Sequence, residues 1–331
     1  MELLGTIGLF ILGLALLIFG GDWFVDGSIG IAKKLHMPEV LIGATVVSLG
    51  TTLPEVLVSS QAALMGHGEI AYGNAIGSII CNVALIAAIP IAFRPSGIDP
   101  KNYRLPVVFF FTAAAFYLFN AYVFQRFSRL AGIVLLLIFG VYMFLNVRQS
   151  LAKQEIFDEN DISDVVDLPK KEPVVPVWIS IVKLVAGAAM IAFGADLLVD
   201  NGTLLAKAMG VPEAVIALTF VALGTSLPEL VTAIVSLKKG HSDLTAGNVI
   251  GANFFNLVLV SGVSTVISPY TIPMEKTLFG INSSLVLDLP LMLFVMLLLI
   301  VPAFKKKRFM RWQGIVLLFI YAANCVLQFT I

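Results

Sequence analysis

The sequence predicts an all-α membrane protein with ten transmembrane helices, arranged as two inverted five-helix repeats with broken helices at an ion site. Two observations support this fold class: an apolar composition and an internal repeat. Of the 331 residues, 59% are hydrophobic and 13% are charged, which is far from the balance of a soluble domain. Because apolar runs recur along the whole chain, we expect a lipid bilayer to surround most of the protein.

Ten spans are expected, and the N-terminal apolar run is the first of them. This run lacks a basic segment and a small-residue cleavage site before Gly20, so we expect a retained span and not a signal peptide. The predicted spans cover residues 3–30, 38–64, 69–92, 105–122, 128–147, 175–205, 212–237, 243–268, 281–302 and 312–329.

An internal repeat relates the two halves of the chain at a spacing of 174 residues, starting from Phe19 and Phe193. The central match places Leu49-Gly-Thr-Thr-Leu-Pro-Glu55 opposite Leu223-Gly-Thr-Ser-Leu-Pro-Glu229. A second match places Gly73-Asn-Ala-Ile-Gly-Ser78 and Asn82 opposite Gly247-Asn-Val-Ile-Gly-Ala252 and Asn256. Chance does not account for two such matches at one spacing.

Five spans per repeat is an odd number, which predicts that the second repeat enters the membrane from the opposite side, as in many secondary transporters. The loops of one side hold 16 lysines and arginines and those of the other side hold four, with Lys183 inside a span. By the positive-inside rule, the rich side is cytoplasmic and both termini lie outside the cell (inner or plasma) membrane.

This topology divides the chain into a first repeat at 1–148, a cytoplasmic acidic linker at 149–173 and a second repeat at 174–331. The linker is expected to be solvated. A regulatory calcium site there is the alternative, although the segment lacks the glycine and the terminal glutamate of an EF-hand loop.

Two glutamates mark the middle of the membrane. An ionised carboxylate at this depth is costly, so Glu55 and Glu229 indicate an ion path. Each follows a proline, and neither Pro54 nor Pro228 can donate the N–H that would bond the carbonyl four residues earlier. Broken backbone is tolerated at this depth where it lines a polar cavity or is buried in protein. Because the breaks fall at corresponding places in the two halves, they predict one shared cation site.

The side chains around the glutamates supply hard oxygen ligands, with no histidine or thiolate among them. The candidates are Thr51, Thr52, Thr225 and Ser226, one turn before the glutamates, and Ser78 and Asn82 on one face of the following span. Such ligands favour sodium, calcium or magnesium, and the charge of two carboxylates matches one calcium ion. Glycines four residues apart, at 73 and 77 and at 247 and 251, are expected to bring this span close to its neighbour.

The paired motifs resemble the two alpha repeats of the cation/calcium exchanger superfamily, and the whole chain resembles prokaryotic sodium/calcium exchangers. The resemblance implies exchange of sodium for calcium by alternating access, with calcium extrusion as the expected direction. It implies Glu55 and Glu229 as central ligands. The other ligands that it implies are Thr51, Thr225, Ser226, Ser78, Asn82 and the backbone carbonyls of Ser48 and Ala222.

The chain departs from the family pattern at two positions. Ala252 stands where a serine is common, and Asn256 stands where some members carry aspartate. Asn256 is nevertheless expected to face the site, because the repeat pairs it with Asn82. The departures leave the ion count and any potassium dependence open.

Several polar residues allow two interpretations each. Asp22, Asp26, Asp196 and Asp200 could line an ion entrance or cap helices; Asn74 and Asn248 could link helices or reach the site; His67 and His241 could serve turns or sense protons.

Among functions, proton/calcium exchange is the nearest alternative, and a passive cation channel is a more distant one because channels place such ligands around a pore axis. An enzyme is not expected, since the sequence lacks paired metal histidines, a nucleophile elbow and a phosphate-binding glycine loop.

The expected partners are the transported Na⁺ and Ca²⁺ ions, without a cofactor. The zero net charge gives no reason to expect nucleic-acid binding, and the chain is expected to function as a monomer.

Overall fold

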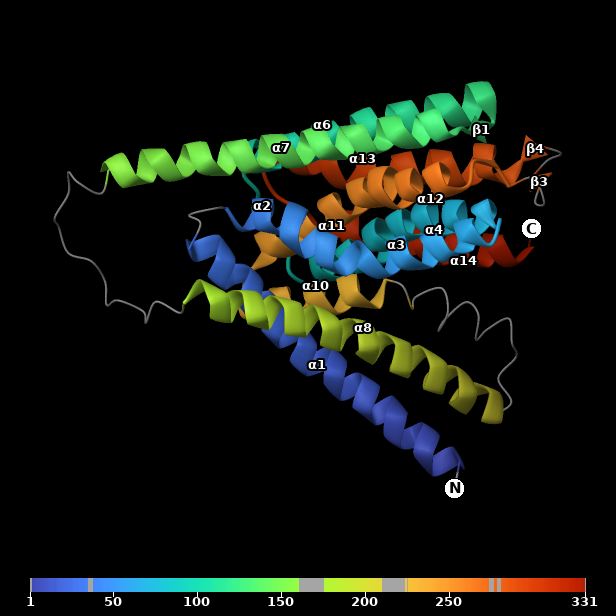
Figure 1. Cartoon of the computed structure of the whole chain (residues 1–331), viewed down its shortest axis with the longest axis horizontal. Helices are drawn as coiled ribbons and strands as arrows, with labels where there is room; N and C mark the ends of the chain where they lie inside the picture. Colours follow the sequence, from blue (N-terminus) through green and yellow to red (C-terminus); the bar gives the residue numbers. More distant parts are fainter. Residues whose placement is uncertain are drawn as a thin grey trace.

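The computed structural model describes residues 2–34, 38–160, 176–209, 224, 226–273, 277–278 and 281–330. Within these ranges the chain is almost entirely helical (Figure 1). Eight of the described helices are long and apolar enough to cross a membrane, and they coincide with eight of the ten expected spans. The expected span at 212–237 is described only in its second part, and the one at 312–329 corresponds to a further helix, α14.

The first half of the chain forms five long helical segments. The first is α1 (Glu2–Lys34), and the second joins α2 (Glu39–Ile42), η1 (Gly43–Val47) and α3 (Ser48–Leu64). The third joins α4 (Gly68–Cys81), η2 (Asn82–Ala87) and α5 (Ala88–Phe93). The fourth joins α6 (Pro100–Phe119) and η3 (Asn120–Phe124), and the fifth is α7 (Arg129–Asn160), which continues beyond the expected end of its span at 147. The η segments are π-helical, with backbone bonds that reach five residues back.

The described part of the second half follows the same order. It comprises α8 (Val177–Ala208), α10 (Leu227–Lys239), α11 (Ser242–Phe255) with η5 (Asn256–Val260) and α12 (Ser261–Ile267), η6 (Ser284–Asp288) with α13 (Leu289–Lys306), and α14 (Arg311–Thr330). Two short antiparallel ribbons pair β1 (Arg126–Phe127) with β2 (Tyr270–Thr271) and β3 (Thr277–Leu278) with β4 (Ile281–Asn282). The first ribbon joins the two halves directly.

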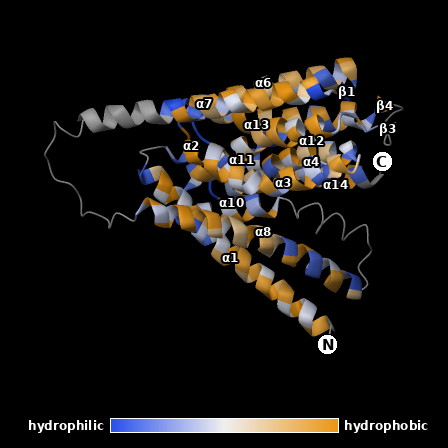
Figure 2. Ribbon diagram, in the orientation of Figure 1, coloured by the Kyte–Doolittle hydropathy of each residue, from blue (hydrophilic) through white to orange (hydrophobic). Residues whose placement is uncertain are grey.

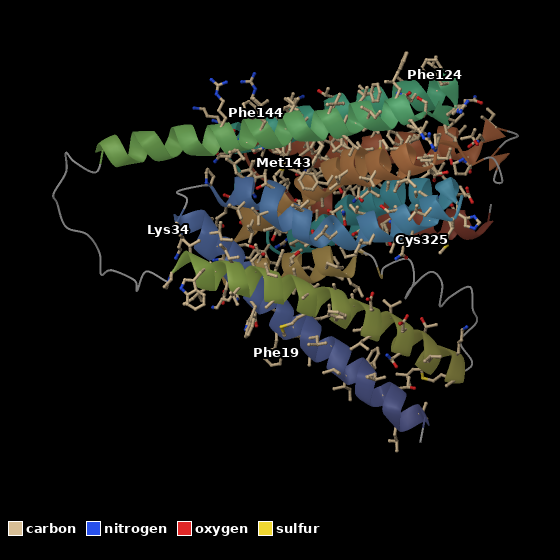
Figure 3. The ribbon with its side chains drawn as sticks, in the orientation of Figure 1. Phe19, Lys34, Phe124, Met143, Phe144 and Cys325 are labelled. Carbon is tan, nitrogen blue, oxygen red and sulfur yellow. The ribbon has the colours of Figure 1, made fainter. Side chains whose placement is uncertain are left out.

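Hydrophobic residues predominate along most of the long helices (Figure 2), and many large apolar side chains are exposed. Phe19, Phe124 and Phe144, labelled in Figure 3, have 59%, 59% and 64% of their surface exposed. Exposure of so many large apolar side chains would be unfavourable in water. A lipid environment removes that cost, so the surface is that of a membrane protein.

The largest buried cluster lies among α4, α6, α7, α11 and α13. Aromatic rings fill it, and the ring centroids of Tyr142 and Phe254 lie 4.6 Å apart. The Tyr142 hydroxyl donates a hydrogen bond to the carbonyl oxygen of Ala44 at 2.8 Å. Because Ala44 belongs to η1, this bond ties the π-helical segment before α3 to the core.

Helices α1 and α8 pack against each other along glycine-rich faces, below the rest of the bundle in Figure 1. A Cβ atom added at Gly27 would lie 2.5 Å from the backbone nitrogen of Leu184, and one at Gly187 would lie 2.5 Å from that of Phe24. Small residues permit this close approach of two membrane helices, as in other membrane bundles. The α1 and α8 pair contacts the remaining helices chiefly through α10 and α2.

Candidate cation site

Two glutamates lie at the centre of the bundle, Glu55 in α3 and Glu229 in α10. Both side chains are 0% exposed, and the two carboxyl groups are close enough to interact electrostatically. Within the described residues, none of their four carboxylate oxygens has a hydrogen-bond partner. Buried polar groups are rarely left unsatisfied, and unpaired buried charges are strongly unfavourable. A cation between the carboxylates would remove this cost.

The backbone around the glutamates differs between the halves and from the prediction. The break expected at Pro54 is not present, because α3 stays helical from Ser48 to Leu64. Neighbouring side chains can satisfy carbonyls that a membrane-helix proline frees. In the second half, α10 begins at Leu227, so Pro228 occupies its first turn, where proline is well tolerated.

Asn248 of α11 links both glutamate helices. Its Oδ1 lies 3.2 Å from the Ser48 hydroxyl and accepts a hydrogen bond from the Thr51 hydroxyl at 3.3 Å. Its Nδ2 donates to the Thr232 hydroxyl of α10 at 3.2 Å. Thr51 in turn neighbours the carboxylate of Glu229. The structure therefore brings Ser48 and Thr51 together with the second repeat.

Asn74, the repeat counterpart of Asn248, has a similar role in the first half. Its Nδ2 donates to the Ser59 hydroxyl at 2.9 Å and to the Glu55 carbonyl oxygen at 3.3 Å. Of the two interpretations open for these asparagines, the structure supports helix linkage. Both side chains fix the position of backbone or hydroxyl groups next to the carboxylates.

Four further predicted residues place neutral polar atoms in the interior. Their side chains are at most 2% exposed and their polar atoms have no hydrogen-bond partner among the described residues: Thr52, Ser226, Asn82 and Asn256. Asn82 is the first residue of η2 and Asn256 is the first of η5. Segment η2 packs against α10, and η5 packs against α3. Each asparagine thus starts a π-helical segment that contacts the glutamate helix of the opposite repeat.

The two π-helical segments were not foreseen, and no pattern in the sequence marks them. π-helical turns are frequently found at functional sites. The predicted ligands Ala222 and Thr225 lie outside the described residues.

Ser78 lies on α4 and lines an open cavity of about 550 Å³. The cavity is bounded by α3, α4, the end of η6 and α14, at the end of the bundle where α4 begins and α14 ends. Sequence reasoning missed several of its lining residues, among them Cys81, Asp288 and Tyr321. Cys81 also neighbours Ser226 and Glu229, so the cavity reaches the edge of the site.

The two glycine pairs behave differently. A Cβ at Gly247 or Gly251 would collide with Val40 or with Ser48 and Ala44, which confirms the expected close approach for α11. Gly73 and Gly77 of α4 have nothing within 4 Å of an added Cβ, so the expectation is wrong for this pair. The reason is the cavity, which both residues line.

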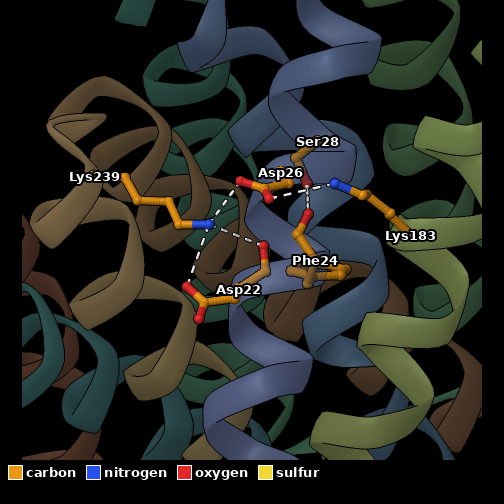
Figure 4. Close-up of polar contacts among 6 residues, drawn as sticks. All are labelled: Asp22, Phe24, Asp26, Ser28, Lys183 and Lys239. Atoms are coloured by element: carbon orange, nitrogen blue, oxygen red, sulfur yellow. Dashed lines mark hydrogen bonds and ion pairs between the residues drawn. The ribbon is translucent and has the colours of Figure 1, made fainter. Parts of the chain in front are cut away.

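Asp22 and Asp26 of α1 form ion pairs and do not join the site. Lys239 Nζ lies 2.6 Å from Asp26 Oδ1 and 3.2 Å from Asp22 Oδ1, and Lys183 Nζ lies 3.5 Å from Asp26 Oδ2 (Figure 4). Among the described residues there is no group of three histidine, cysteine, aspartate or glutamate side chains that could hold a metal ion. The described site therefore combines two carboxylates with neutral oxygens.

A family model described as "Sodium/calcium exchanger protein" matches residues 5–148 and 179–330. The sodium/calcium exchanger MaX1 of Methanosarcina acetivorans is 30% identical over 350 residues, covering 97% of both chains. The putative antiporter CaxA of Alkalimonas amylolytica is 33% identical and also covers 97% of both chains. Among solved structures, the sodium-calcium exchanger NCX_Mj soaked with Na⁺ and Sr²⁺ matches with a TM-score of 0.77 and 31% identity, over 97% of each chain.

Proposed function

Because the chain belongs to the sodium/calcium exchanger protein family, we propose that it extrudes calcium from the cell in exchange for sodium by alternating access. The observation that carries this proposal is the pair of fully buried carboxylates, Glu55 and Glu229, whose oxygens lack hydrogen-bond partners among the described residues. One calcium ion or two sodium ions would neutralise the pair. The same carboxylates therefore serve both ions, and each ion excludes the other.

Neutral oxygens complete the proposed site. Thr51, Thr52, Ser226 and Asn82 supply buried hydroxyl and amide groups, and Ser48, Ser78, Ala222, Thr225 and Asn256 are the further proposed ligands. Calcium accepts six to eight oxygen ligands in flexible geometry. Asn248 and Asn74 orient this set through the hydrogen bonds described above and are positioning residues.

We assign the chain ten transmembrane helices in two inverted repeats, at 1–148 and 174–331, joined by a cytoplasmic linker at 149–173. Both termini then lie outside the cell membrane, and the monomer is the functional unit. The matched family segments, 5–148 and 179–330, support the division. With this orientation the cavity beside Ser78 opens to the outside.

The unequal glycine pairs support alternating access. On the proposed cytoplasmic side, Gly247 and Gly251 pack tightly against η1 and α2. On the outer side, their repeat counterparts Gly73 and Gly77 line the open cavity. An exchange of roles between the two repeats would close the outer side and open the inner one. A channel would need both sides open at once.

Competition binding tests this proposal. Purified protein should bind calcium, and sodium should displace it, whereas Glu55→Gln or Glu229→Gln should each weaken calcium binding by more than about a hundredfold. A charge about 4 Å from a unit cation contributes about 4 kcal/mol at an effective dielectric constant of about 20. Glu69→Gln is the control, because Glu69 is an exposed carboxylate that bonds His67. Displacement by protons but not by sodium would favour the proton/calcium alternative, and calcium affinity unchanged in either glutamine variant would refute the site.

A further inference from the structure

The open cavity contains an acidic residue that the proposed site does not use. Asp288, the last residue of η6, lines it together with Ser78, Asn324 and Gln328, and Gln328 Nε2 donates to Asp288 Oδ1 at 2.8 Å. A carboxylate within a membrane-spanning segment is costly and commonly lines a water-filled ion path.

Two other residues of the cavity lining, Tyr72 and Asn324, carry buried oxygens without hydrogen-bond partners among the described residues. The Tyr72 hydroxyl belongs to a side chain that is 2% exposed, and it has no hydrogen-bond partner among the described residues. The Asn324 Oδ1 is likewise buried without a partner. Hard oxygens around one carboxylate suit a hydrated sodium or calcium ion.

We infer that this cavity is a cation-attracting vestibule in which Asp288 gathers sodium and calcium ions before they reach Glu55 and Glu229. This inference deepens the proposed function and rests on it for the identity of the ions. The negative charge of Asp288 raises the local concentration of cations at the mouth of the site. Anions are repelled for the same reason.

Cys325, which lines the cavity, is a native reporter of this potential. In intact cells, the rate at which it reacts with a positively charged, membrane-impermeant thiosulfonate should exceed that with a negatively charged one. Asp288→Asn should lower the ratio of the two rates about fourfold, the effect of one unit charge about 10 Å away in water. Asp288→Glu should retain it, and Glu69→Gln, which removes a carboxylate outside the cavity, should leave it unchanged.

An equal ratio in wild type and Asp288→Asn, or an equal fall in Glu69→Gln, would overturn the inference. The readout needs no ion transport, so it is independent of whether sodium/calcium exchange is observed. The modified cysteine is identified by mass spectrometry.

A different observation carries a second proposal, which concerns the ion pairs in Figure 4. Two aspartates of α1 and two lysines, one from α8 and one from α10, form a cluster with no net charge. Lys239 has contacts to Asp22 and Asp26, and it also donates to the Asp22 carbonyl oxygen at 3.1 Å. Because Lys239 ends the helix that carries Glu229, the cluster ties the α1 and α8 pair to the site.

The repeat counterpart of this cluster is incomplete. Asp196 and Asp200 correspond to Asp22 and Asp26 at the 174-residue spacing, whereas Lys183 and Lys239 correspond to Leu9 and Met65. Asp196 neighbours Asp200, and neither forms an ion pair with any residue that the structure describes. Asp22, Asp26, Lys183 and Lys239 thus form ion pairs near one end of the bundle. At the repeat-related place near the other end, Asp196 and Asp200 have no lysine counterparts.

We propose that the cluster of Asp22, Asp26, Lys183 and Lys239 is a one-sided lock that favours the conformation with the outer cavity open. The lock holds α10 against α1 on the proposed cytoplasmic side. The conformation with the inner side open has no equivalent set of ion pairs on the outer side. The proposal uses the alternating access put forward above, and it predicts an unequal resting population of the two states.

The rate of Cys325 modification by the external cationic reagent reports how often the outer cavity is open. Lys239→Met replaces this lysine with methionine, the residue at the repeat-related position 65. The variant should slow modification of Cys325 several-fold, because it removes the ion pairs to Asp22 and Asp26. Lys239→Arg, which keeps a positive charge beside Asp22 and Asp26, should leave the rate close to that of the wild type. Lys238→Met is the control, because it removes the same charge from an exposed neighbour.

Met65→Lys should also slow the reaction, because it supplies Asp196 and Asp200 with a partner in the opposite conformation. Unchanged modification in Lys239→Met, an equal effect in Lys238→Met, or an equal loss of rate in Lys239→Arg would overturn the lock. Unchanged or faster modification in Met65→Lys would overturn its one-sided character. These labelling rates do not depend on ion transport. Failure of the lock proposal can therefore be distinguished from failure of the proposed sodium/calcium exchange.

Discussion

At the scale of single residues, the site depends on which oxygens are neutral and which are charged. Glu55 and Glu229 are the two carboxylates at the centre, and Asn82 and Asn256 place amide groups at repeat-related positions. A calcium ion bound to this set gives no net charge, and two sodium ions give the same balance. A third sodium ion bound per cycle would therefore make the exchange carry net charge across the membrane.

The substitution Asn256→Asp tests this charge balance. A third carboxylate near Glu55 and Glu229 would be repelled by both, which favours binding of a proton or an additional cation. Calcium flux in this variant should therefore fall more steeply as the pH is lowered than it does in the wild type. The repeat-related variant Asn82→Asp should behave in the same way. If flux measured across a pH series is unaffected by Asn256→Asp, Asn256 does not face the site.

At the scale of helices, close packing on one side of the site contrasts with open space on the other. Gly251 of α11 lies against Ser48 and Ala44, whereas Gly77 of α4 faces the cavity. The two glycines are repeat counterparts, so their surroundings differ because of the conformation and not because of the motif. The same sequence pattern is thus found in a closed and an open setting within one molecule.

Alanine at each of these glycines should have different effects on stability. Gly251→Ala places a methyl group against backbone and hydroxyl atoms of η1 and α3, and overpacking of this kind typically costs about 1–3 kcal/mol. Gly77→Ala meets no atom within 4 Å, so it should leave the folded state unchanged. Thermal unfolding of the purified variants in detergent provides the measurement. Equal melting temperatures for the two variants would contradict the packing described for α11.

The helices themselves could be predicted from apolar runs, because a membrane helix needs about 20 apolar residues whatever its neighbours are. The burial of Glu55, Glu229 and Thr51 could be predicted because the repeat marks these positions twice. The π-helical segments could not, since η1 is held by a bond from Tyr142 that depends on how α7 packs. The helical path through Pro54 also escaped prediction, because the packing around a membrane helix decides whether a proline interrupts it.

The cavity residues illustrate the same limit. Cys81, Asp288 and Tyr321 come from three segments far apart in the sequence, and no local pattern brings them together. Asp288 could be noticed in the sequence as a carboxylate within a predicted span. It lies outside the two repeated motifs, so the repeat did not mark it as a site residue. Long-range packing, not local propensity, decides which polar residues line the path to the site.

At the scale of the whole molecule, the proposed orientation in the membrane rests on the distribution of lysine and arginine. The charge-rich loops and the 149–173 linker should lie in the cytoplasm. A single cysteine placed in this linker, in a variant without Cys81 and Cys325, should resist an impermeant thiol reagent applied to intact cells. It should react after the membrane is permeabilised. Modification in intact cells would reverse the orientation and the proposed direction of the cavity.

Calcium flux into proteoliposomes with imposed ion gradients tests the central claim most directly. An outward sodium gradient should drive calcium uptake without potassium or a proton gradient. A membrane potential should change its rate if, as we propose, a third sodium ion is bound per cycle. Glu55→Gln should show no sodium-driven uptake, and Glu69→Gln should retain it. Calcium uptake that follows a proton gradient without sodium, that needs potassium, or that equilibrates calcium passively would contradict sodium/calcium exchange at this site.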